Sequence, residues 1–232
     1  MKPYTKIISA GVLLPVILFS GLSLAHGQSA EPQMVVTWKA YGSYVPPTYT
    51  DKALPNQESR LTASLMLLVN GKPVDLSRET VYWYLNNTLI SSGVGNQSII
   101  FSPFGKAPSY MDLEAELPSY NGATLTHDIQ IPLVTPKAVI ESPHPSGQSS
   151  ENPIILQGIP YFFYVSDPGE LSYAWSVNGQ SPTTAENPQT LQVSLDPSTP
   201  SGSSLNVGLT ITNPNDRTSA EDSTTVIYIK QL

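Results

Sequence analysis

Two segments of the chain carry the same pattern, a tryptophan inside an extended run followed by an asparagine turn. Trp83 precedes Asn86-Asn87, and Trp175 precedes Asn178-Gly179. The two tryptophans are 92 positions apart, about the length of one small β-sandwich domain. A pattern repeated at that spacing predicts two sandwiches in tandem.

Alternation of apolar and polar residues continues through most of the chain, and no helical stripe follows residue 30. At 112–117, three carboxylates alternate with three apolar residues, which predicts a strand with one face in a core and one in water. The first set of expected strands is 34–40, 60–69, 80–85, 99–101, 113–117 and 125–133. The second is 138–140, 154–165, 171–177, 191–195, 205–211 and 225–229. The fold class is therefore all-β, with two tandem β-sandwiches at 31–135 and 136–232.

Three Asn-Gly pairs supply the positive-φ residues that tight hairpins need: Asn70-Gly71, Asn121-Gly122 and Asn178-Gly179. The link between the sandwiches, residues 134–137, spans at most about 14 Å when extended. We therefore expect a semi-rigid rod.

The N-terminal segment, residues 1–30, has the features of a secretory signal peptide. Lys2 and Lys6 precede an uncharged apolar run that begins at Ile7 and ends at Ala25, and small residues follow up to Ala30. The run is also long enough to cross a bilayer as a helix, so an uncleaved anchor is the alternative and would be the only membrane contact. Both alternatives predict an extracytoplasmic protein, either secreted or associated with the cell envelope.

Composition excludes several classes of function. The chain has no cysteine, which excludes a disulfide framework, thiol catalysis and thiolate metal sites. The net charge is −7, or −9 without Lys2 and Lys6. That sign argues against nucleic acid and anionic lipid as partners.

Catalytic motifs are missing from the sequence. It contains no Gly-x-Ser-x-Gly elbow, no His-Glu-x-x-His and no phosphate loop. His26 lies in the N-terminal segment, His127 shares the apolar face of its strand, and His144 is expected in an exposed loop. We predict no enzyme and no cofactor.

Two acidic loops, 167–170 and 213–216, offer oxygen ligands of the kind that calcium binds. Calcium needs six to eight oxygen ligands, more than either loop offers alone. Asp, Asn, Pro and Gly are also what turns require. We therefore predict no metal site.

The most unusual stretch combines Tyr41, Tyr44 and Tyr49 with Pro46 and Pro47. Tyrosine offers a large contact area with few rotors to order, so these three residues are the candidate binding site. The alternative is that the segment wraps the edge of its own sandwich and blocks strand pairing. Trp83 and Trp175 are predicted to be core residues.

One family resemblance adds to these observations. Residues 204–213, Ser-Leu-Asn-Val-Gly-Leu-Thr-Ile-Thr-Asn, follow a tryptophan-bearing strand and precede a final strand. This arrangement resembles the late strands of bacterial PKD and related immunoglobulin-like extracellular modules, over most of 138–232 and more weakly over 34–135. The PKD hallmark Trp-Asp-Phe-Gly-Asp-Gly is absent, because Trp175 is followed by Ser-Val-Asn-Gly.

The resemblance implies a non-catalytic structural or adhesive protein, secreted or on a bacterial cell surface. A carbohydrate- or peptide-binding accessory protein that uses the surface near Tyr41, Tyr44 and Tyr49 is the alternative. The implied partner is an unknown surface protein or glycan.

Overall fold

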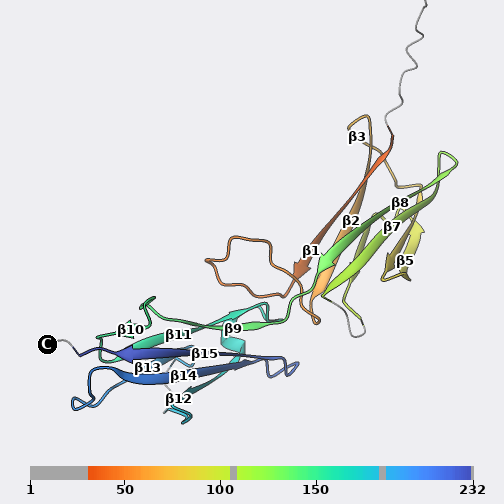
Figure 1. Ribbon diagram of the computed structural model, residues 1–232. Helices are drawn as coiled ribbons and strands as arrows, with labels where there is room; N and C mark the ends of the chain where they lie inside the picture. Colours follow the sequence, from red (N-terminus) through yellow and green to blue (C-terminus); the bar gives the residue numbers. More distant parts are fainter. Residues whose placement is uncertain (1–30, 105–108, 183–186, 231–232) are drawn as a thin grey trace, which may run out of the picture.

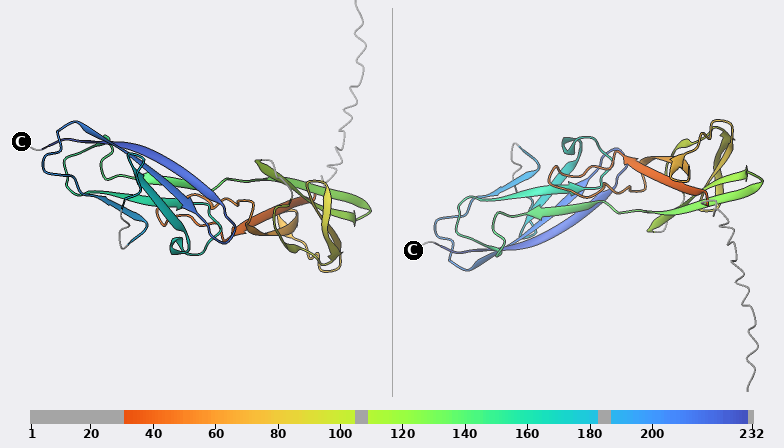
Figure 2. Two further views of the ribbon diagram at one scale, coloured as in Figure 1. Left: turned by 90° about the horizontal axis from the view of Figure 1, so that it is seen from below. Right: turned by 90° about the horizontal axis from the view of Figure 1, so that it is seen from above.

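Two β-sandwiches lie end to end in the computed structural model (Figure 1), and the molecule is elongated in all three views (Figure 2). The structure describes residues 31–104, 109–182 and 187–230. The predicted signal peptide or anchor, residues 1–30, lies outside the described residues. Among those that are described, no helix is both long and apolar enough to cross a membrane.

The first sandwich has two antiparallel sheets. In one, β2 (Arg60–Val69) pairs with β1 (Gln33–Tyr41), β3 (Lys72–Pro73) and β6 (Ser98–Phe101). The other has the order β5-β4-β7-β8, formed by β5 (Thr88–Val94), β4 (Thr80–Leu85), β7 (Tyr110–Tyr120) and β8 (Ala123–Pro132). The core between them contains Trp83, Leu61 and Leu113, all fully buried.

The second sandwich repeats this plan. One sheet has the order β13-β11-β9, formed by β13 (Thr190–Val193), β11 (Ile154–Tyr161) and β9 (Lys137–Glu141). The other has the order β10-β15-β14-β12, formed by β10 (Gln148–Ser149), β15 (Ser219–Tyr228), β14 (Ser203–Thr212) and β12 (Ser172–Val177). A 3₁₀ turn, η1 (Pro168–Glu170), precedes β12. The chain therefore consists of two tandem Ig-like β-sandwiches.

The repeated tryptophan pattern has the same hydrogen bonds in both sandwiches. Trp83 on β4 donates from Nε1 to the carbonyl of Asn96, and Trp175 on β12 donates to that of Pro188, in each case 13 residues downstream. The turn after each tryptophan-bearing strand is also fixed by the same kind of hydrogen bond. The side-chain oxygen of Asn86 accepts from the amide of Asp112, as that of Asn178 accepts from the amide of Asn206.

Every expected strand is present, with some changes at the ends. All three Asn-Gly pairs have positive φ at both residues, as predicted. The short β3 and β10 and the longer β5 were not expected, and β15 begins at Ser219 rather than 225. The expected strand 154–165 stops at Tyr161, because Phe162 adopts a φ of +61° and turns the chain.

Candidate functional site

The long connection between β1 and β2, residues 42–59, leaves the first sandwich and lies against the second (Figure 1). The Tyr44 amide donates to the Phe163 carbonyl at 2.8 Å, and the Phe162 amide donates to the Tyr44 carbonyl at 2.6 Å. Ser43 and Tyr164 form an isolated antiparallel bridge beside them. We call residues 42–59 together with 162–164 the clasp. Its backbone ladder joins the two sandwiches directly.

Asn56 is the buried polar centre of the clasp, with only 2% of its surface exposed. Its Nδ2 donates to the Phe162 carbonyl at 2.6 Å. Its Oδ1 accepts from the Glu58 amide and the Ser59 hydroxyl. The Asn56 side chain therefore forms hydrogen bonds both within its own loop and with the second sandwich. At such a buried site, a polar group without a hydrogen-bond partner would destabilise the protein.

The clasp is also tied to the first sandwich and to the link. The Lys52 ammonium lies 3.2 Å from the ring centroid of Trp38 on β1, and burial lowers the pKa of Lys52. The Val134 amide in the link donates to the Pro55 carbonyl. The clasp thus contacts the first sandwich and the link as well as the second sandwich.

Tyr44 packs into a hydrophobic cluster of the second sandwich that includes Phe163, Val165 and Leu171. Burial, and then the charge of Asp167, raises the pKa of the Tyr44 phenol. Burial is also the main cause that raises the pKa of Tyr173, with Tyr44 and Asp167 as lesser causes. Both effects indicate that the contact between the clasp and the second sandwich is partly shielded from water.

The other two predicted binding tyrosines lie apart from Tyr44. Tyr49 makes edge-to-face ring contacts with Tyr161 at 6.1 Å and with Phe162 at 5.7 Å. Tyr41, at the end of β1, remains 44% exposed, with the Lys39 ammonium 5.0 Å from its ring centroid. The three rings thus have different neighbours, and their role in binding an external partner stays a prediction.

The sequence analysis missed Asn56 and Phe162. One signal for them was available, because connections longer than about 12–15 residues without structure of their own are uncommon and often functional. A strand over 154–165, as expected, would place Phe162 and Phe163 on opposite faces. The turn at Phe162 instead buries both phenylalanines.

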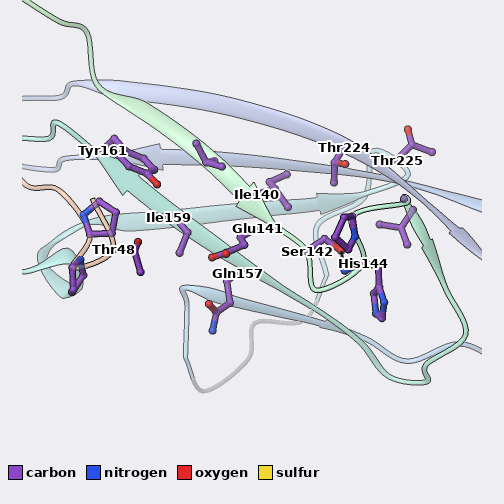
Figure 3. Close-up of a pocket in the computed structure, with 16 residues that line it drawn as sticks. Thr48, Ile140, Glu141, Ser142, His144, Gln157, Ile159, Tyr161, Thr224 and Thr225 are labelled. Atoms are coloured by element: carbon purple, nitrogen blue, oxygen red, sulfur yellow. Dashed lines mark hydrogen bonds between the residues drawn. The ribbon is translucent and has the colours of Figure 1, made fainter. Parts of the chain in front are cut away.

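A groove of about 600 Å³ lies between the clasp and the second sandwich (Figure 3). Pro46, Pro47 and Thr48 form one wall, and Ile159 and Tyr161 on β11 line it from the second sandwich. Glu141 and Gln157 face each other across β9 and β11, and Figure 3 shows them side by side, with His144 farther along the groove. The groove thus combines an aromatic ring and prolines with hydrogen-bonding side chains.

His144 is more buried than the expected exposed loop position, with 17% of its side chain exposed. Its Nε2 lies 3.0 Å from the hydroxyl of Ser149 and 3.5 Å from a carboxylate oxygen of Glu151. In a catalytic triad the carboxylate binds the other ring nitrogen and the hydroxyl is accessible. Here both partners meet the same nitrogen and Ser149 is buried, so the group stabilises a turn.

The two loops weighed as calcium sites use their oxygens on the chain itself. Asp167 and Glu170 form a capping box on η1. Asp216 accepts from the Asn213 amide group and from the Thr218 backbone. The described residues contain no cluster of three or more His, Cys, Asp or Glu that could hold a metal ion.

Comparison with known proteins finds similar solved structures only. Three N-terminal domains of the bacteriophage RB49 highly immunogenic outer capsid protein (Hoc) align with 84% of this chain and 59% of their own, at 12% identity and a TM-score of 0.42. Fibronectin(III)-like modules of Clostridium thermocellum CbhA align with 84% of this chain and 95% of theirs, at 14% identity and a TM-score of 0.29. A solved chain from a 1.5-MDa bacterial ice-binding adhesin aligns with 85% of this chain and 66% of the solved chain, at 14% identity and a TM-score of 0.32. No family model and no curated protein matches the chain.

Proposed function

We propose that the protein is a non-catalytic structural or adhesive module of an extracytoplasmic surface, whose two sandwiches keep one fixed orientation. The observation that carries this proposal is the clasp. Domains within one chain ordinarily move relative to each other unless a substantial contact joins them. Here Tyr44, Asn56 and Phe162 form that contact through backbone, side-chain and ring interactions.

Small-angle X-ray scattering on the native chain and its Asn56→Ala variant tests the proposal. The native protein should fit one orientation of the sandwiches, and the variant should need a range of orientations. Gln130→Ala, an exposed polar change on β8, is the control and should scatter like the native protein. A native protein that already needs a range of orientations would refute the proposed fixed orientation.

A second candidate function is binding of a glycan or an extended peptide in the groove. The observation that favours it is the lining, since Tyr161 and the prolines offer surfaces for stacking while Gln157 and Glu141 offer hydrogen bonds. Glycan arrays and peptide libraries, followed by calorimetry on any ligand found, test this function. Gln157→Ala should weaken binding and the distant Ile100→Ala should not. Equal binding by both variants would exclude the groove.

A further inference from the structure

Strand β5 is an outer strand of the first sandwich that lacks the usual protection. It pairs only with β4 and lies at the margin of the sandwich in Figure 1. It contains no charged residue and no proline. Leu89 and Val94 on it are 50% and 68% exposed. Lysine, proline and covering segments are the devices that ordinarily keep an edge from pairing with another strand.

Two strands of the second sandwich, β9 and β15, are protected by such devices. On β9, the amide of Ile140 donates to the carboxylate of Asp222 at 2.7 Å. On β15, the outer side pairs with β10, and the Ile227 amide donates to the Gly147 carbonyl. Within the described residues, no backbone hydrogen bond joins β5 to a segment other than β4. Strand β5 therefore lacks the cover that β9 and β15 have.

Backbone groups on the free side of β5 specify the chemistry of a partner. Pairs in an antiparallel ladder alternate between hydrogen-bonded and non-hydrogen-bonded, so about half of the amides and carbonyls of β5 point away from β4. The pairing is regular from Ser91 to Val94, with a register shift between Trp83 and Tyr84 on β4. Another extended strand is the structure that satisfies such a row of groups.

We propose that β5 pairs antiparallel with β5 of a second copy of this chain, which joins two four-stranded sheets into one of eight strands. An uncharged strand meets its own copy without repulsion between like charges. Antiparallel pairing is compatible with a two-fold axis, the commonest symmetry of homodimers. It also brings the Leu89 end of each strand toward the Val94 end of the other, so exposed apolar groups cover each other.

Negative charge elsewhere on the chain does not oppose this dimer. The acidic residues of this sheet lie on β7, which includes Glu114 and Glu116, and on β8, which has Asp128, so they are two and three strands inward from the edge. The two copies of β7 would be separated by five strand spacings, about 24 Å. The Debye length at physiological ionic strength is about 8 Å, so this repulsion is largely screened.

The native chain has no cysteine, so a single introduced cysteine is a unique reporter of the contact. Ser92 lies near the centre of the regular part of β5 and would lie close to the two-fold axis. Under mild oxidation, full-length Ser92→Cys should form a disulfide-linked species of twice the chain mass. Ser64→Cys, an exposed serine on the central strand β2, is the matched control and should remain monomeric.

A second substitution separates edge pairing from other modes of association. Leu89→Lys added to Ser92→Cys places a charge on the strand, and we expect several-fold less cross-linked dimer. The proposal is overturned if Ser92→Cys stays monomeric, if Ser64→Cys cross-links equally, or if Leu89→Lys has no effect. A cross-linked product whose mass is not twice that of the chain would show a different partner and would also overturn it.

Discussion

The Phe162 amide donates to the Tyr44 carbonyl at 2.6 Å, across the boundary between the two sandwiches. The carbonyl of the same Phe162 accepts from Asn56. Its positive φ turns the chain out of β11 and presents both groups to the clasp. One residue in an unusual backbone conformation therefore receives contacts from two parts of a segment more than 100 positions away.

Asn56→Ala should destabilise the protein by about 1–3 kcal/mol, because buried groups on both sides of the clasp lose their partners. Urea unfolding measures the change, and hydrogen exchange should show faster exchange at Tyr44 and Phe162. Gln130→Ala serves as the exposed control. A neutral Asn56→Ala would show that the clasp contributes little to stability.

Gly42→Ala should cost more than Gly71→Ala. Both glycines have positive φ, +78° and +73°, so both substitutions carry similar backbone strain. An added Cβ at Gly71 meets nothing, whereas at Gly42 it meets the ring of Tyr164. The difference in unfolding free energy between the two variants isolates the clasp contact, and equal costs would mean that the ring moves aside freely.

Trp83→Ala should destabilise the protein by about 3–5 kcal/mol, as expected for a large truncation in a core. Trp83 is fully buried, whereas Trp175 is half-buried between two smaller clusters. Trp175→Ala should therefore cost less. Urea unfolding of both variants checks the order, and a larger cost for Trp175→Ala would contradict it.

Alkaline pH should weaken the contact between the sandwiches. The pKa of Tyr44 is raised mainly by burial, so the folded state favours the neutral phenol. The contribution of the Tyr44 phenol to the free energy of unfolding is complete below its pKa in the unfolded chain, about 10. That contribution is lost as the pH rises through the pKa of Tyr44 in the folded protein. Tyr44→Phe cannot ionise and should lose less stability between pH 9 and 11. Tyr110→Phe, on the exposed end of β7, is the control, and identical profiles for both variants would contradict the prediction.

Intact mass of the native protein, measured separately from envelope and medium, tests the predicted N-terminal segment. A mass that matches a chain starting after Ala25 or Ala30 would show that a signal peptide had been cleaved. A full-length mass confined to the membrane would instead show an anchor formed by the run from Ile7 to Ala25.

Local signals made the architecture predictable. Each signal could be recognised within a short stretch of sequence. These signals are the Asn-Gly pairs at the hairpins, the alternation on the long strands and the asparagine turn after each tryptophan. Strand β5 escaped notice because Ser91, Ser92 and Gly93 interrupt its apolar pattern. The clasp could not be derived, because it depends on a positive φ at Phe162, which phenylalanine rarely adopts, and on a contact between residues 44 and 162.

The clasp also determines how the molecule would carry a mechanical load. A tether attached near β1 and another near the end of β15 would pull on opposite ends of the molecule, and the tension would pass through the short link. Because the clasp joins the same two bodies beside that link, bending at the junction must break the backbone hydrogen bonds of Tyr44 and withdraw its ring from the hydrophobic cluster of the second sandwich. The protein should therefore resist bending even though only a few residues connect its two halves.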